Sequence, residues 1–106
     1  MDCIFCRIIR GELPSKMHYS SDNWVVIEDI NPQARHHLLI ISRKHIPSFS
    51  AMENGDLHLL RGLNTVVNKV SAKLDFASYQ LLTNNGAAAG QTVMHLHWHL
   101  LSNDEG

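Results

Sequence analysis

The chain has 106 residues, and its one compositional excess is histidine: eight histidines and two cysteines stand beside nine Lys and Arg and ten Asp and Glu. This length predicts a single domain over residues 1–106. The formal charge of −1 leaves no basic surplus to follow a nucleic-acid backbone, which argues against general nucleic-acid binding but allows a single nucleotide. With 44% hydrophobic and 18% charged residues, the chain can pack one modest core, so disorder and fibrous folds are excluded.

No segment predicts export or a membrane partner. Residues 1–3 lack a basic region, and the longest aliphatic run, 38–41, is far shorter than the roughly 20 apolar residues that span a bilayer. We therefore expect a cytoplasmic protein. A disulfide between Cys3 and Cys6 would close only a trivial loop, so a reduced pair available to a metal fits better.

A short helix is predicted at the N-terminus. Asp2 can cap its first turn, and Gly11 followed by Pro14 ends it. Because Cys3 and Cys6 are three residues apart, this helix would place both thiols on one side. The apolar residues that share a helix face are Ile4, Phe5, Ile8 and Ile9.

Five strands are predicted along the chain. The β-like runs 16–20 and 24–28 are separated by a turn-forming Ser-Asp-Asn, which suits a hairpin. The segment 37–42 is continuously aliphatic in its middle, as in a strand that is covered on both faces. The last two strands are expected at 79–83 and 93–101, separated by a loop of small residues.

One long amphipathic helix is predicted between the third and fourth strands. From residue 57 to 74, apolar residues recur at steps of three and four with polar residues between them. Its start is marked either by a capping box of Ser50 and Glu53 or by Asp56. Together these elements predict an α+β fold: about five antiparallel strands, one long helix packed on the sheet and a short N-terminal helix.

The histidines at 95, 97 and 99 alternate with apolar residues in the last predicted strand. Because successive strand side chains point to opposite faces, the three imidazoles would share one face at spacings of about 7 Å, with the apolar residues in the core. Three interpretations are open from this spacing alone. They are a solvated polar face, a metal tripod, and catalysis with one imidazole as nucleophile or base beside donors to an anion.

The loop before these histidines favours the interpretation that the site binds an anion. Residues 84–90 are small, and Gln91 and Thr92 add an amide and a hydroxyl beside the triplet. Backbone N–H groups of such a loop can form an anion-binding nest. As an isolated feature, the segment is equally compatible with an ordinary flexible loop.

Three segments of the sequence resemble the histidine triad (HIT) superfamily. Residues 90–101 carry a signature of three alternating histidines, and residues 4–14 and 29–34 resemble the Hint branch, the nucleoside phosphoramidases. The likeness extends from residue 3 to residue 101. It implies the α+β fold described above, a purine nucleotide as substrate, and a homodimer formed through the long helix and a sheet edge.

The resemblance implies a nucleotide hydrolase or transferase and gives roles to single residues. His97 corresponds to a nucleophile that attacks the α-phosphorus and forms a nucleotidyl-imidazole, which water then cleaves. His99 and His37 match histidines that contact the phosphate or support the nucleophile. Thr92 stands where a hydroxyl lies near the leaving group, and Asp29 matches the carboxylate that receives the ribose hydroxyls.

The remaining implied contacts surround the phosphate and the base. Asn84 and Gln91 match polar contacts on the phosphate side. The apolar walls around the base are implied to be Ile4, Phe5, Ile8, Ile27 and Ile30. The chemistry is physically sound, because an imidazole with a pKa of about 6.5 is largely neutral near pH 7 and neighbouring donors can stabilise a phosphoryl transition state without a metal.

The cysteine pair has its own interpretation. From spacing alone, two buried thiols or a redox pair are alternatives to a metal site. Some superfamily members that carry this pair close a zinc site with a histidine after the aliphatic strand and the first histidine of the triad. The resemblance thus implies zinc bound by Cys3, Cys6, His45 and His95, and this zinc would be structural because protein fills all four positions.

The sequence departs from the Hint branch after the triad, where residues 102–105 replace a Gly-Gly-Arg turn. This departure leaves open whether the chain belongs to the phosphoramidases or to the dinucleoside polyphosphate hydrolases. A separate alternative is a non-catalytic, zinc-stabilised nucleotide-binding protein. His18, His36 and His58 receive no function, and His36 is expected to point to the face opposite His37.

Overall fold

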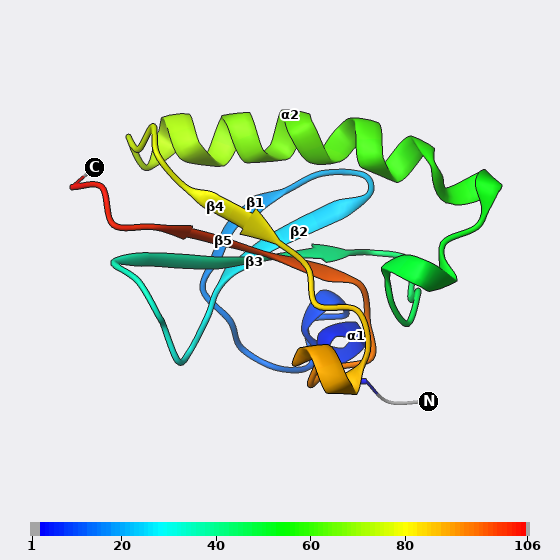
Figure 1. Cartoon of the computed structure of the whole chain (residues 1–106). Coiled ribbons are helices and arrows are strands. Elements are labelled where there is room, and N and C mark those ends of the chain that lie inside the picture. Colours follow the sequence, from blue (N-terminus) through cyan, green and yellow to red (C-terminus); the bar gives the residue numbers. More distant parts are fainter. Residues whose placement is uncertain (1–2, 106) are drawn as a thin grey trace.

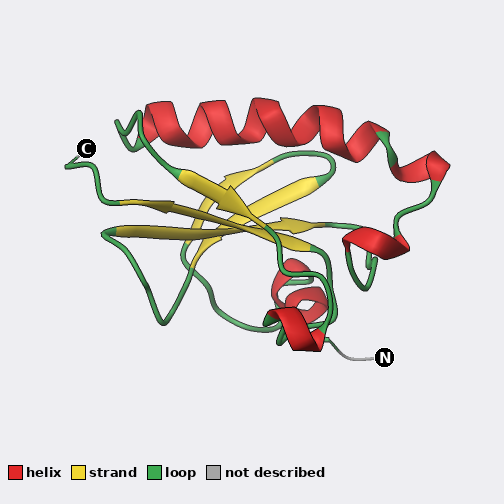
Figure 2. Ribbon diagram, viewed as in Figure 1, coloured by secondary structure: helices red, strands yellow, loops and turns green. Residues whose placement is uncertain are grey.

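The computed structural model describes residues 3–105 and shows one five-stranded antiparallel sheet between two helices (Figures 1 and 2). The strands are β1 (Met17–Ser20), β2 (Trp24–Glu28), β3 (His36–Ser42), β4 (Gln80–Leu82) and β5 (His97–Ser102). The helices are α1 (Ile4–Ile9) and α2 (His58–Lys73), with short 3-10 turns η1 (Phe49–Ala51), η2 (Asn54–Asp56) and η3 (Ala87–Ala89). The predicted α+β fold is confirmed.

The sheet has the strand order β1-β2-β3-β5-β4, so β3 lies at its centre. In Figure 1, α2 crosses one face and α1 lies below the other. Leu38 and Ile40 of β3 pack in the core under α2, whereas Leu39 and Ile41 pack with Phe5 of α1. The prediction that this aliphatic strand is covered on both faces is therefore confirmed.

Helix α1 begins with a cysteine cap. The Sγ atom of Cys3 accepts a hydrogen bond from the backbone N–H of Cys6 at 3.3 Å. The predicted cap, Asp2, lies outside the described residues. Gly11 follows the helix with a φ of +79°, a left-handed conformation that glycine adopts without a steric penalty, so the predicted end of the helix is confirmed.

Helix α2 is preceded by a capping box, but the box differs from one predicted alternative. Glu53, which caps η2, and Asp56, the last residue of η2, exchange side-chain and backbone hydrogen bonds. The proposed Ser50 and Glu53 box is wrong, because Ser50 belongs to η1. The alternative start at Asp56 is close to the structure, and this buried carboxylate also accepts a 2.6 Å bond from Lys44.

Strand β5 starts later than predicted. The expected strand over 93–101 is wrong in its first four residues, since β5 begins at His97. Before it, the backbone of Leu96 bonds to the segment after β3: its N–H donates to the Ile46 carbonyl at 2.6 Å and its carbonyl accepts from the Ser42 N–H at 3.2 Å. The first histidine of the alternation thus precedes the strand.

Two matched isoleucines test the packing of the sheet. Ile40 is fully buried at the centre of β3, whereas Ile30 is 92% exposed. We expect Ile40→Ala to lower the free energy of unfolding by about 2–5 kcal/mol, because it removes buried carbon and leaves a cavity. Ile30→Ala should change it by less than about 0.5 kcal/mol. Urea unfolding of both variants measures the difference, and equal losses would contradict this packing.

No helix within residues 3–105 combines the length and apolar character that a membrane crossing demands.

Candidate functional site

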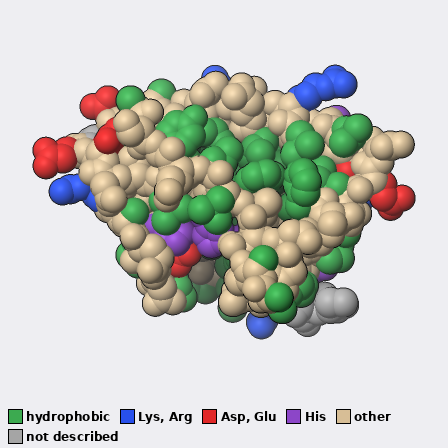
Figure 3. Space-filling view, in the orientation of Figure 1, with side chains coloured by type: hydrophobic (Ala, Val, Ile, Leu, Met, Phe, Trp, Pro, Cys, Tyr) green, Lys and Arg blue, Asp and Glu red, His purple; other side chains and the backbone are tan. Residues whose placement is uncertain are grey.

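Strands β3 and β5 bring three histidines together on the α1 face of the sheet. In register, His37 lies opposite Leu101, and His99 lies opposite Leu39. The ring centroids of His97 and His99 are 5.2 Å apart, as are those of His37 and His99. Figure 3 shows histidine side chains in a hollow of the surface with acidic atoms beside them. The rings lie closer than the expected 7 Å, near enough for one small anion to contact two of them.

His97 is held in one orientation by the backbone beside it. Its Nδ1 lies 2.7 Å from the carbonyl oxygen of His95, so Nδ1 carries the proton and donates, and Nε2 keeps its lone pair. The ring is buried, and Phe5 packs edge-on against it with ring centroids 5.0 Å apart. Burial lowers the pKa of His97, which favours the neutral imidazole. This arrangement provides an unprotonated ring nitrogen that can act as a nucleophile.

His99 and His37 form a hydrogen-bonded pair next to Asp29. The Nε2 atom of His37 lies 3.0 Å from Nδ1 of His99 and 3.3 Å from Oδ2 of Asp29. Burial lowers the pKa of His99, and the neighbouring histidines lower it further. The other oxygen of Asp29 accepts from the backbone N–H of Asn31 at 2.8 Å, which fixes the carboxylate at the end of β2.

A pocket of about 430 Å³ opens beside Asp29, between the end of α1 and the end of β2. The predicted base-wall residues that line it are Ile8, Ile27 and Ile30. The other two do not: Ile4 is half-exposed elsewhere on α1, and Phe5 is buried against the histidine rings instead. Three residues of this helix, Ile4, Phe5 and Ile8, were expected to contact the base, but only Ile8 lines the pocket.

Gln91 is buried, and its amide is fully used inside the protein. Its Nε2 donates to the carbonyls of Pro47 at 2.7 Å and Val93 at 2.9 Å, and its Oε1 accepts from the Gly86 N–H at 2.8 Å. Both amide protons are therefore occupied. In this structure Gln91 holds the 86–91 loop in place and has no donor left for a phosphate.

The other polar residues of this loop have separate environments. Asn84 donates from Nδ2 to the Ala89 carbonyl at 2.8 Å, and Thr92 is exposed at the end of the loop. Thr83, which the sequence did not single out, donates its hydroxyl to the His97 carbonyl at 2.6 Å. Thr83 is the last residue of the predicted strand 79–83 and directly follows β4 in the structure, and nothing in the sequence pattern indicated this contact.

Four predicted metal ligands converge at the start of α1. The Nδ1 atom of His95 lies 3.2 Å from Cys3 Sγ and 3.6 Å from Cys6 Sγ, and the Nδ1 atom of His45 lies 3.2 Å from Cys6 Sγ and 3.1 Å from His95 Nδ1. Ligand atoms of a tetrahedral zinc site are separated by about 3.3–3.8 Å. The four side chains thus have the chemistry and nearly the spacing of a Cys₂His₂ site.

The environment of these ligands supports metal binding. His95 is fully buried, and its Nε2 donates to the Ser42 carbonyl at 2.6 Å, which leaves the Nδ1 lone pair directed at the other ligands. Burial and the neighbouring Cys3 raise the pKa of the Cys6 thiol. A metal ion would compensate for this by stabilising the thiolate.

The three histidines without an assigned function lie outside these clusters. His18 pairs with Glu28 at 3.1 Å, and His58 lies on the exposed side of α2. His36 points to the α2 face, where its ring packs on Phe76 with centroids 5.0 Å apart. This is the face opposite His37, as the strand alternation predicts.

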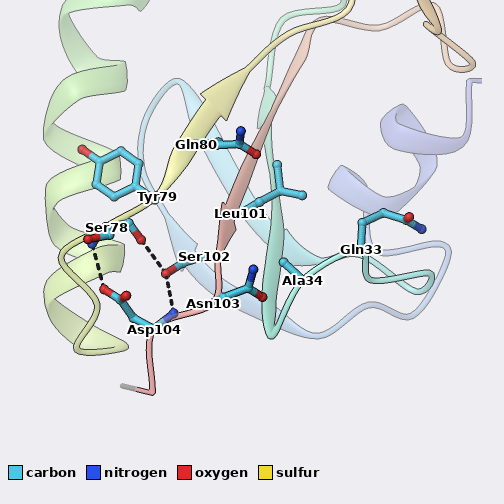
Figure 4. A pocket seen from close by; sticks show the side chains of 9 residues that line it. All are labelled: Gln33, Ala34, Ser78, Tyr79, Gln80, Leu101, Ser102, Asn103 and Asp104. Carbon is cyan, nitrogen blue, oxygen red and sulfur yellow. Dashed lines mark hydrogen bonds between the residues drawn. The ribbon is translucent and has the colours of Figure 1, made fainter.

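The residues that follow the triad line part of a second pocket, of about 350 Å³, where the end of β5 lies beside the start of β4 (Figure 4). Ser102 donates its hydroxyl to the Ser78 carbonyl at 2.5 Å. Asp104 accepts from the backbone N–H groups of Ala77 and Ser78 at 2.9 and 2.8 Å. The segment that departs from the Hint pattern therefore ties the end of β5 to the segment before β4.

Comparison with known proteins identifies the family. Residues 2–106 match the model of the family described as scavenger mRNA decapping enzyme C-term binding. An uncharacterized HIT-like protein of Methanocaldococcus jannaschii is 39% identical over 105 residues, which are 98% of this chain and 81% of that protein. Adenylylsulfatase HINT3 of Arabidopsis thaliana is 36% identical over 105 residues, 98% of this chain and 53% of that protein.

Solved structures agree with this result. A HIT family hydrolase from Clostridium thermocellum has a TM-score of 0.93 and 42% identity, covering 98% of this chain and 92% of that one. A zinc-bound histidine triad family protein from Mycobacterium smegmatis has a TM-score of 0.82 and 27% identity, covering 98% and 76%. The fold and the histidine cluster together are those of a histidine triad protein. The chain belongs to the HIT-like family.

Proposed function

We propose that this protein hydrolyses nucleotides at the α-phosphate through a nucleotidyl intermediate on His97. The observation that carries the proposal is the 2.7 Å bond from His97 Nδ1–H to the His95 carbonyl, which leaves Nε2 as the free nucleophile. The expected substrates are purine nucleoside phosphoramidates or other adenylated compounds. A hydrolase of the Hint-like branch is supported by the similar proteins named as a HIT family hydrolase and an adenylylsulfatase.

The proposed reaction has two steps. First, His97 Nε2 attacks the α-phosphorus, and the bond to the leaving group breaks with its electron pair on the leaving group. Water then attacks the phosphorus, and the bond to Nε2 breaks with its pair returning to the ring. Overall, water supplies a hydroxyl group to phosphorus and a proton to the leaving group. His99 stabilises the phosphoryl charge, with the exposed Thr92 hydroxyl beside the leaving group.

The nucleoside is proposed to occupy the 430 Å³ pocket. Ile8 and Ile27 would contact one side of the base and Ile30 the other, which suits a purine without selecting one. Asp29 would accept hydrogen bonds from the ribose hydroxyls. Asn84 and Gln91 would affect phosphate binding indirectly, by holding the loop beside the phosphate in place. Phe5 would act indirectly as well, by packing against the His97 ring. Ile4, half-exposed outside the lining, is left without a proposed contact.

We propose that Cys3, Cys6, His45 and His95 hold a structural zinc ion. The zinc-bound histidine triad structure and the convergence of four ligand atoms support this assignment. Bound zinc would cross-link α1 to the segments after β3 and before β5. It takes no part in the chemistry, because four protein ligands leave no position for substrate.

We also propose that residues 1–106 act as one cytoplasmic domain that forms a homodimer. Leu81 and Leu82 of the edge strand β4 are partly exposed, as is Tyr79 just before it. Figure 3 shows hydrophobic side chains gathered over β4 and α2. A second copy that pairs along β4 would cover both the strand edge and these side chains.

A substrate panel tests the proposed activity. Purified protein is assayed with an adenosine phosphoramidate, adenylyl sulfate and a diadenosine polyphosphate in the presence of chelator. We expect phosphoramidate hydrolysis to give the highest kcat/KM. Higher turnover of the dinucleotide would assign the protein to the other branch, and AMP binding without turnover of any compound would contradict an enzymatic function.

The pH profile of this hydrolysis follows from the burial of the histidines. Because burial lowers the pKa of His97 and His99 below about 6.5, their neutral forms persist at lower pH than in a free imidazole. The acid limb of kcat/KM should therefore lie below pH 6.5. The same lowered pKa values affect stability, because the folded state favours the neutral rings of His97 and His99 more than the unfolded chain does. The free energy of unfolding should therefore be highest above about pH 6.5, where both states hold neutral rings, and should decrease as the pH falls. An acid limb above pH 7 would contradict the burial argument.

A further inference from the structure

The backbone of the loop before β3 makes a hydrogen bond that restricts the protons of the histidine pair. The N–H of Gln33 donates to Nδ1 of His37 at 3.0 Å. A backbone N–H can only donate, so Nδ1 of His37 must be the acceptor and carry no proton. A neutral His37 therefore has its single ring proton on Nε2.

This restriction passes to the next ring. The Nε2 atom of His37, which carries the proton, lies 3.0 Å from Nδ1 of His99, so Nδ1 of His99 accepts and its own proton is on Nε2. The carboxylate of Asp29, 3.3 Å from His37 Nε2, favours the same assignment because it too can only accept. Two independent neighbours of His37 thus select one tautomer for both rings.

The two histidines of β5 are left in opposite states. His97 donates from Nδ1 and presents a lone pair at Nε2, whereas His99 accepts at Nδ1 and presents an N–H at Nε2. Within residues 3–105, neither Nε2 atom has a hydrogen-bond partner. With ring centroids 5.2 Å apart, one phosphoryl group can meet the lone pair of one ring and the proton of the other.

The same bond argues against a second metal site. Asp29, His37 and His99 offer ligand atoms within 4.8 Å of one another, a grouping that a metal ion could use. A metal on Nε2 of His37 would require the ring proton on Nδ1, where the Gln33 N–H already points. Two donors would then face each other, so this cluster is better suited to hydrogen bonding than to metal binding.

We propose that the backbone N–H of Gln33 is a positioning group that fixes His37, and through it His99, in the Nε2–H tautomer. His99 then always presents a donor to the phosphate that His97 attacks. The role of this donor in turnover rests on the proposed function, whereas the tautomers themselves are a property of the protein without substrate.

Histidine ring tautomers are read directly from two-bond ¹H–¹⁵N correlation spectra of ligand-free protein at neutral pH. We expect His37 and His99 to be protonated at Nε2 and His97 at Nδ1. A spectrum with Nδ1–H at His37 or His99 would overturn the inference, whatever the activity. Absence of turnover combined with the expected tautomers would instead count only against the proposed function.

Two substitutions at one exposed position isolate the backbone donor. Gln33→Pro removes the N–H. Gln33→Ala keeps it while removing the side chain, whose one hydrogen bond among residues 3–105 goes to the Asn31 carbonyl. We expect the proline variant to populate the second tautomer of His37 and His99 and to lose about tenfold or more in kcat. The alanine variant should keep the wild-type spectrum and kcat. If the proline variant also keeps the wild-type spectrum and kcat, the Gln33 N–H does not fix the tautomers of the two rings. If the proline variant does not fold, the tautomers in the wild-type spectrum still test the inference.

Discussion

Replacing His97 by alanine is expected to reduce the kcat for nucleoside phosphoramidate hydrolysis by about 10³-fold or more. Without an imidazole at this position no nucleotidyl intermediate can form, and the remaining groups only bind and orient the substrate. The ring lies above Phe5, so the variant also loses one packing contact. Steady-state assays and AMP titration, carried out together, separate loss of chemistry from loss of folding, because AMP should still bind.

His36→Ala is the matched control for this variant. His36 is a histidine of the same sheet, but it packs on Phe76 on the opposite face. Its removal should change kcat by less than about twofold while costing some stability through the lost packing. If His97→Ala kept a substantial part of the wild-type kcat, the nucleophile would have to be another group.

The second large effect is expected at the cysteine cluster. Cys3→Ser removes one metal ligand, yet serine is a favoured helix cap and can replace Sγ as acceptor for the Cys6 N–H. The variant therefore tests the loss of a metal ligand without the loss of the helix cap. We expect zinc content to fall from about one per chain to well below one. The thermal midpoint should fall by about 10 °C or more, because bound zinc contributes folding free energy directly.

The physical reason is the short length of α1. A helix of six residues is not stable by itself in water and depends on its attachments. Phe5 provides one attachment through the core, and the zinc cross-link would provide the other. His58→Ala, which removes an exposed histidine remote from the cluster, is the control. Wild-type protein with well below one zinc per chain, together with an unchanged midpoint in Cys3→Ser, would contradict the zinc assignment.

Much of the fold could be predicted because its strands and long helix have distinct patterns. The aliphatic segment of β3 and the three- and four-residue steps of α2 each specify an element that is buried in a defined way. The start of β5 could not be predicted, because the alternation continues through His95 and Leu96. Only the tertiary bonds of Leu96 to Ile46 and Ser42 show that the ladder ends at His97.

The candidate site was predicted best where the residue type restricts the chemistry. Cys3, Cys6, His45 and His95 converge as expected from the resemblance. Amide and apolar side chains were harder, since they suit many environments: Gln91 bonds within the protein, and Phe5 faces the histidines and not the base pocket. Backbone groups such as the Gln33 N–H leave no pattern in a sequence at all.

The most direct test of the account is to trap the intermediate. Protein is mixed with an adenosine phosphoramidate, quenched within one turnover and digested, and the peptides are measured by mass spectrometry. We predict one adenylyl group on the peptide that contains His97, assigned to that ring by fragmentation and absent from His97→Ala. Rapid hydrolysis with no adduct on any histidine, or an adduct on His99 instead, would contradict the account.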